Sequence, residues 1–108
     1  MAYDNTVSVV GNLTRDPELR FTNTGLAVAS FGIAWNQKSQ NGEDKAHFFD
    51  IDVWRELAEN VAESFSKGDR VYVFGRLNWS TWNATDGTQK SKVSITAEDV
   101  GLSAKWVN

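Results

Sequence analysis

Residues 46–65 read AHFFDIDVWRELAENVAESF, and the spacing of the apolar side chains changes within them. Up to position 53 apolar and polar residues alternate, which is typical of a β-strand with one buried side. The apolar side of that strand carries Phe49, Ile51 and Val53, and the polar side carries Phe48, Asp50 and Asp52. From Trp54 to Phe65 the apolar residues recur about every 3.6 positions, which indicates an amphipathic helix. These residues therefore predict a strand that leads directly into a helix, the only helix that we expect.

The flanking residues predict the two ends of this helix. Asp52 is expected to act in the N-cap region, since a short acidic side chain accepts hydrogen bonds from the first free backbone N–H groups. Lys67-Gly68 is expected to supply a basic last turn and a glycine just beyond the end. Arg55 and Glu59, four residues apart, are expected to lie on the exposed side.

Strand patterns surround the helix on both sides. They cover residues 6–13, 26–35 and 46–53 before it, and 70–82 and 91–100 after it. The segment 14–18 breaks the pattern with the only proline, residues 21–25 are expected to form a turn, and residues 36–45 a hairpin loop. Three strands, one helix and two strands make the order of an all-β OB-fold: a five-stranded Greek-key barrel with one α-helix between strands 3 and 4.

The composition indicates one ordinary globular domain that spans residues 1–108. Hydrophobic residues make up 41% of the chain and charged residues 23%, and there is no cysteine for a disulfide or a thiolate metal site. We find neither a signal peptide at the start nor an apolar run that could span a membrane, so we expect a cytoplasmic protein. The net charge of −3 argues against a partner that is held by charge alone.

Catalysis is not expected from this sequence. His47 is the only histidine, and we find no phosphate-binding glycine loop, no metal-ligand spacing and no Ser/His/Asp set. Asp50 and Asp52 could together hold a cation, but two solvated carboxylates on a strand are the better interpretation. We therefore expect no enzyme activity, no cofactor and no bound metal.

The aromatic side chains exceed what a small barrel core needs. Phe31, Ile33, Phe49, Leu57 and Phe65 are expected to fill that core. The surplus suits base stacking on single-stranded nucleic acid, which contributes about 1–3 kcal/mol per base and tolerates any sequence. The candidates are Trp35, Phe48, Trp54, Trp79 and Trp82. Phe48 and Trp82 share their strand faces with polar residues, which favours stacking, whereas for Trp35, Trp54 and Trp79 a place in the core stays equally open.

Two further groups of side chains complete the candidate surfaces. Tyr72 and Phe74 form an outward aromatic pair, which more often marks a subunit interface. The basic residues are few and scattered, and each is either a phosphate contact or a plain surface charge. They are Arg15, Arg20, Arg55, Lys67, Arg76, Lys90 and Lys92.

Several strings resemble the bacterial single-stranded DNA-binding proteins over nearly the whole chain. They are VVGNLTRDPELRF at 9–21, GLAVASFGIA at 25–34, WRELAENV at 54–61, KGDRVYV at 67–73 and GRL at 75–77, and the helix is most similar to actinobacterial members. The resemblance implies an OB-fold that forms homotetramers as dimers of dimers, acts at the nucleoid and protects single strands in replication, recombination and repair. It places stacking at Phe48, Trp54 and Trp82, and basic contacts at Arg20 and Lys67.

The chain departs from this family in two respects. The residues before Trp82 and the position of Asp50, often basic in relatives, are not basic here, which predicts weaker binding and a shallower salt dependence. The chain also ends at Trp106-Val-Asn108, without the flexible linker and acidic tip through which relatives recruit other proteins, so such recruitment is doubtful here. Two rivals stay open: a primosome-like replication accessory that acts through protein contacts, and an OB-fold that binds an oligosaccharide or another flat ligand.

Overall fold

The computed structural model describes residues 5–104, so the first four residues and the last four, Trp106 among them, lie outside the described part. The strands are β1 (Thr6–Leu13), β2 (Glu18–Phe21), β3 (Ala27–Gln37), β4 (Lys45–Trp54), β5 (Arg70–Asn83) and β6 (Gln89–Leu102). The helix α1 (Arg55–Ser64) follows β4 directly, and its ten residues are too short and too polar to traverse a bilayer. The predicted change of period at Trp54 is thus confirmed.

Five of the strands close a ring. Hydrogen bonds connect them in the order β1-β5-β6-β4-β3, and β3 returns to β1 through the pairs Asn12↔Ala34 and Leu13↔Ile33. All of these pairs are antiparallel except β4 with β6, which are parallel. The ring and the helix between its third and fourth strands confirm the all-β OB-fold that the element order predicts. Its interior holds fully buried apolar side chains, the largest of which are Phe31, Ile33, Ile51, Ile95, Val53, Val61, Val71 and Val73.

A sixth strand, β2, was not predicted. It lies outside the ring and pairs with the first half of β3, from Glu18↔Ser30 to Phe21↔Ala27. All four of its residues are exposed, so no alternation of buried and exposed positions could reveal it. The predicted turn is confirmed after Phe21, where Gly25 has a φ of 85° and its N–H donates to the carbonyl of Thr22.

Both predicted helix caps were wrong. The N-cap residue is Trp54, which makes no side-chain cap hydrogen bond, while Asp52 stays within β4 and accepts a hydrogen bond from Ser30. The last turn carries no basic residue, because α1 ends at Ser64. Gly68 lies further along and donates its N–H to the carbonyl of Leu13 at 2.9 Å, so the glycine connects the following turn to β1.

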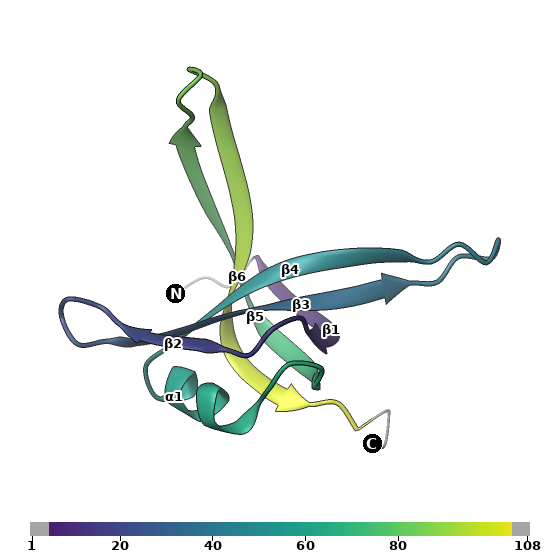
Figure 1. The fold of residues 1–108 in the computed structure, drawn as a ribbon, viewed down its shortest axis with the longest axis horizontal. Coiled ribbons are helices and arrows are strands. Elements are labelled where there is room, and N and C mark those ends of the chain that lie inside the picture. Colours follow the sequence, from purple (N-terminus) through teal and green to yellow (C-terminus); the bar gives the residue numbers. More distant parts are fainter. Residues whose placement is uncertain (1–4, 105–108) are drawn as a thin grey trace.

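Two long hairpins extend from the ring (Figure 1). β3 and β4 form one of them, and β5 and β6 form the other, which leaves the ring in a different direction. The second hairpin bends at a β-bulge between Phe74 and Gly75, where a Cβ on Gly75 would collide with the backbone of β6.

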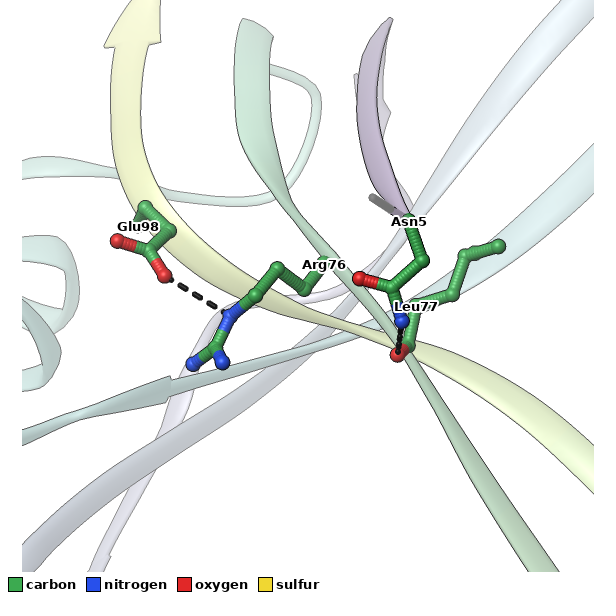
Figure 2. A network of polar contacts seen from close by, with 4 residues as sticks. All are labelled: Asn5, Arg76, Leu77 and Glu98. Carbon is green, nitrogen blue, oxygen red and sulfur yellow. Dashed lines mark hydrogen bonds and ion pairs between the residues drawn. The ribbon is translucent and has the colours of Figure 1, made fainter. Parts of the chain in front are cut away.

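Polar contacts brace the base of the β5–β6 hairpin (Figure 2). Nε of Arg76 lies 3.0 Å from Oε1 of Glu98 across the two strands. Nδ2 of Asn5 donates to the carbonyl of Leu77 at 3.3 Å, which connects the start of β1 to β5. These contacts hold the hairpin where it leaves the ring and so set the position of the residues that it carries outward.

Candidate nucleic-acid interface

Alternate residues of β3 and β4 form a surface on the side of the sheet away from the core. The core side contains the pairs Ala29↔Val53, Phe31↔Ile51 and Ile33↔Phe49. Because side chains alternate along a strand, the intervening pairs point the other way. They are Val28↔Trp54, Ser30↔Asp52, Gly32↔Asp50 and Ala34↔Phe48. We call the surface that these residues begin, together with its continuation on the neighbouring strands, the outer face.

The outer face continues over the neighbouring strands in both directions. On one side Arg20 of β2 pairs with Val28. On the other side Asp52 pairs with Thr96 of β6, and Thr96 pairs with Arg76 of β5. From Arg76 outward, alternate residues of β5 point the same way as far as Trp82, which pairs with Lys90 near the hairpin tip.

Three of the predicted stacking residues therefore share one face. Phe48 is 71% exposed, Trp54 41% and Trp82 46%, although each belongs to a strand whose alternate residues are buried or face the other way. Exposed rings on one polar sheet surface are the arrangement that base stacking requires. Of the predicted basic residues, Arg20, Arg76, Lys90 and Lys92 lie on this same face.

Trp35 and Trp79 point to the side of their hairpins opposite to Phe48 and Trp82. Trp35 pairs with His47 and stacks on its imidazole ring, with 5.3 Å between the ring centroids. Nε2 of that imidazole is 2.9 Å from Oε1 of Gln37. Trp79 pairs with Val93 and is 66% exposed. Both tryptophans continue the core side of their strands beyond the end of the core, so they are exposed without sharing the surface of Phe48, Trp54 and Trp82.

A hollow of about 570 Å³ lies between the β2–β3 turn and the start of α1. Trp54, Arg55 and Phe21 are among the residues that line it, and Phe21 is 61% exposed. Arg55 has a φ of 63°, a left-handed conformation that is uncommon outside glycine and that costs of order 1 kcal/mol or more. The sequence placed Phe21 only in a turn, so its place in the hollow that Trp54 also lines was missed.

Arg15 lies in the β1–β2 connection, and Lys67, in the connection from α1 to β5, lies beside it. The backbone N–H of Lys67 donates to Oδ1 of Asp16 at 2.7 Å, which places this residue beside the connection and not on a strand of the outer face. Arg15 reaches over Gly32: a Cβ placed on that glycine would lie 2.9 Å from Nη1 of the arginine. Gly32 lies on the outer face, so the guanidinium of Arg15 lies there too. The sequence had indicated Arg15 only as one of several scattered basic residues.

Carboxylates are interspersed with the cations of this face. Asp50 lies 2.6 Å from Nζ of Lys92, and Glu98 pairs with Arg76. Within residues 5–104 no group of three acidic, histidine or cysteine side chains is arranged to hold a metal ion. In this part of the chain, Asp50 and Asp52 therefore have no third ligand with which they could hold a cation.

Comparison with known proteins identifies the family. Residues 4–103 match the profile of the single-strand binding protein family. The chain belongs to this family. It is 45% identical over 112 aligned residues to a single-stranded DNA-binding protein of Mycolicibacterium smegmatis, with 98% of this chain and 68% of the relative covered.

Other relatives in the family carry the same name. The protein of Paenarthrobacter aurescens is 42% identical over all of this chain and 67% of its own length. That of Corynebacterium glutamicum is 46% identical over 93% of this chain and 47% of its own length. The predicted similarity to actinobacterial members is thus confirmed, and the matched part makes up between about half and two thirds of these longer relatives.

Proposed function

We propose that this protein binds single-stranded DNA on its outer face, without catalysis and with little dependence on sequence. The observation that carries the proposal is that Phe48, Trp54 and Trp82 lie exposed on one continuous sheet surface. Every base has a flat π surface, so such rings accept any base. Membership of the single-strand binding protein family supports the same function.

Positive side chains on this face would hold the phosphates between stacked bases. Arg20, Arg76 and Arg15 lie on the same face as the aromatic rings, where they would serve a strand that crosses the sheet from β2 to the β5–β6 hairpin. Arg55 would act at the hollow beside Trp54, and Lys67 would act only on a strand that leaves the face near the β1–β2 connection. Trp35 and Trp79 would add platforms for a strand that continues around the hairpin edges. Duplex DNA is expected to bind poorly, because its bases are already stacked on each other.

Tryptophan fluorescence tests this proposal directly. Titration with oligo-dT should quench the emission strongly and saturably, and a duplex of the same length should not. The measurement is repeated at two salt concentrations, since stacking should survive moderate salt better than phosphate contacts do. A folded protein that shows neither quenching nor binding at low salt would overturn the proposal.

We also propose that the protein assembles into homotetramers. Tyr72 and Phe74 are 46% and 38% exposed on β5 and lie beside Val10 and Ser8 of β1, which makes an apolar patch that suits a subunit contact. Assembly lengthens the path available to one DNA strand and so raises avidity. Light scattering of the wild type and of Phe74→Glu would measure this, and a wild type that stays monomeric at micromolar concentration would contradict it.

The biological role that follows is protection of exposed single strands in replication, recombination and repair, at the nucleoid in the cytoplasm. Two observations favour a second candidate, an accessory protein that acts through protein contacts: the net charge is −3, and cations of the outer face are paired with carboxylates. Weak DNA binding together with tight binding to a replication protein would favour that second candidate.

A further inference from the structure

Two carboxylates lie between the stacking rings of the outer face. Phe48, Asp50, Asp52 and Trp54 follow one another at alternate positions of β4, so all four point outward. A DNA strand that stacks on both rings runs over the two carboxylates between them. Negative charge at this place opposes a polyanion, so these aspartates need an explanation if the face binds DNA.

Each aspartate holds a side chain that a phosphate would also use. Oδ2 of Asp50 is 2.6 Å from Nζ of Lys92 on β6. Oδ1 of Asp52 accepts a hydrogen bond from Oγ of Ser30 at 3.0 Å, and that hydroxyl accepts one from Nη1 of Arg20 at 3.3 Å. Carboxylate and phosphate are both oxyanions that accept charge-assisted hydrogen bonds, so they compete for the same N–H donors.

We propose that Asp50 is an internal competitor for DNA: it occupies Lys92 in the free protein, and a phosphate must displace it when a strand binds. This inference rests on the proposed function. The side chains of Lys92 and Asp50 are 56% and 42% exposed, so water and salt reach the pair and it can open readily. The pair lowers the affinity for phosphate, and binding therefore depends more strongly on the stacked bases.

A second role for the same pair makes the opposite prediction. β4 and β6 pair only at Ile51↔Ile95 and Asp52↔Thr96, and beyond these the two hairpins diverge (Figure 1). The ion pair between Asp50 and Lys92 lies where the hairpins diverge and could fix the spacing between them. If this were its main role, its loss would weaken DNA binding, whereas loss of a competitor strengthens DNA binding.

The test measures oligo-dT affinity of Asp50→Asn by fluorescence anisotropy over a range of salt concentrations. We expect the affinity to rise roughly two- to fivefold, the range that an exposed ion pair supports. The salt dependence should steepen, by up to about 0.7 in slope for one released phosphate contact on a single strand. Unfolding midpoints measured alongside would show that the variant is folded.

Two controls isolate the pair. Glu63→Gln on α1 makes the same change in net charge away from the outer face, so it reports the general effect of charge alone. Lys92→Met removes the cation, and in that background Asp50→Asn should leave the salt slope unchanged, because only repulsion by the carboxylate is lost and no phosphate contact is gained. The coupling between the two positions in the salt slope then measures the competition itself.

The outcomes separate the inference from the proposed function. A folded wild type that does not bind oligo-dT overturns the proposed function, and the inference with it. A wild type that binds, with an Asp50→Asn variant that gains nothing beyond the Glu63→Gln control or binds more weakly, overturns only the inference. A salt slope that steepens as much in the Lys92→Met background overturns it as well, because the effect of Asp50 would then not act through Lys92.

Discussion

The two sides of β4 have opposite chemistry although they share one backbone. The core side holds Ile51 and Val53, neither of which is exposed to solvent, while the outer side holds Phe48 at 71% exposure and Asp50 in an ion pair. Burial explains Ile51 and Val53, since both apolar side chains are removed from water. It does not explain Phe48, whose ring stays in water in the isolated chain. The difference teaches that large apolar side chains in this molecule have two uses, and that exposure distinguishes them.

The largest expected effect comes from the core side. Phe31→Ala should lower the free energy of unfolding by about 3–5 kcal/mol, because it removes a fully buried ring and leaves a cavity. Phe48→Ala should change it by less than about 1 kcal/mol, as is usual for an exposed position. Urea unfolding of both variants measures the contrast, and equal losses of stability would erase the distinction between the two faces.

On the outer face, the effect should appear in binding instead of stability. Phe48→Ala and Trp82→Ala should each weaken oligo-dT binding by about 1–3 kcal/mol, the usual contribution of one stacked base. Trp79→Ala, on the other side of the same hairpin, should cost distinctly less. Anisotropy titrations compare the three, and a Trp79 variant as weak as the Trp82 variant would show that both sides of the hairpin bind DNA.

The hollow beside Trp54 is a third surface, after the two sides of the sheet, at which stacking can be tested. Phe21→Ala should weaken oligo-dT binding by about 1 kcal/mol if the strand continues past Trp54 into the hollow, because Phe21 then contributes a further stacking surface. Leu102→Ala is a matched control, since Leu102 is 67% exposed and at the far end of β6. The same small loss in both variants would exclude the hollow from the binding path.

Charge on the outer face should appear mainly in the salt dependence. Arg20→Met should lower the slope of affinity against salt by about 0.7, the value for one phosphate contact on a single strand. Lys38→Met in the β3–β4 loop provides a control with the same change in net charge. A slope that changes by the same amount in both variants would show that Arg20 contributes only to the general charge.

The smallest expected effect concerns the tip of the β5–β6 hairpin. Hydrogen bonds from the Thr88 hydroxyl at 2.6 Å and from the Thr88 N–H at 3.0 Å hold the pKa of Asp86 below its ordinary value. A carboxyl whose pKa is lower in the folded state adds stability above its unfolded pKa and loses it as the pH falls through the folded pKa. NMR titration should therefore show Asp86 protonating at lower pH than a free aspartate, and Thr88→Ala should raise this pKa. An unchanged pKa in the variant would assign the shift to another cause.

The alternation of apolar and polar residues was enough to predict most of the ring, and also which side of β4 and of β5 faces the core. Buried and exposed positions repeat with the strand period from Asp50 to Val53 and from Arg70 to Arg76, so the sides of β4 and β5 could be assigned in advance. The exposure of Phe48 followed from the aspartates beside it. Four exposed residues in β2 carry no such pattern, and the cap at Trp54 uses no side chain, so neither could be predicted.

What the chain by itself determined is local: the five strands of its ring, its helix, the turn at Gly25, and the side of each of these strands that faces the core. Only the tertiary structure decided which exposed residues come together. It brought Phe21 and Trp54 to the walls of one hollow, and it paired Lys92 with Asp50 from a distant strand. The physical reason is that the period of a strand reports burial along one segment, whereas these neighbours depend on the register and divergence of hairpins far apart in the chain.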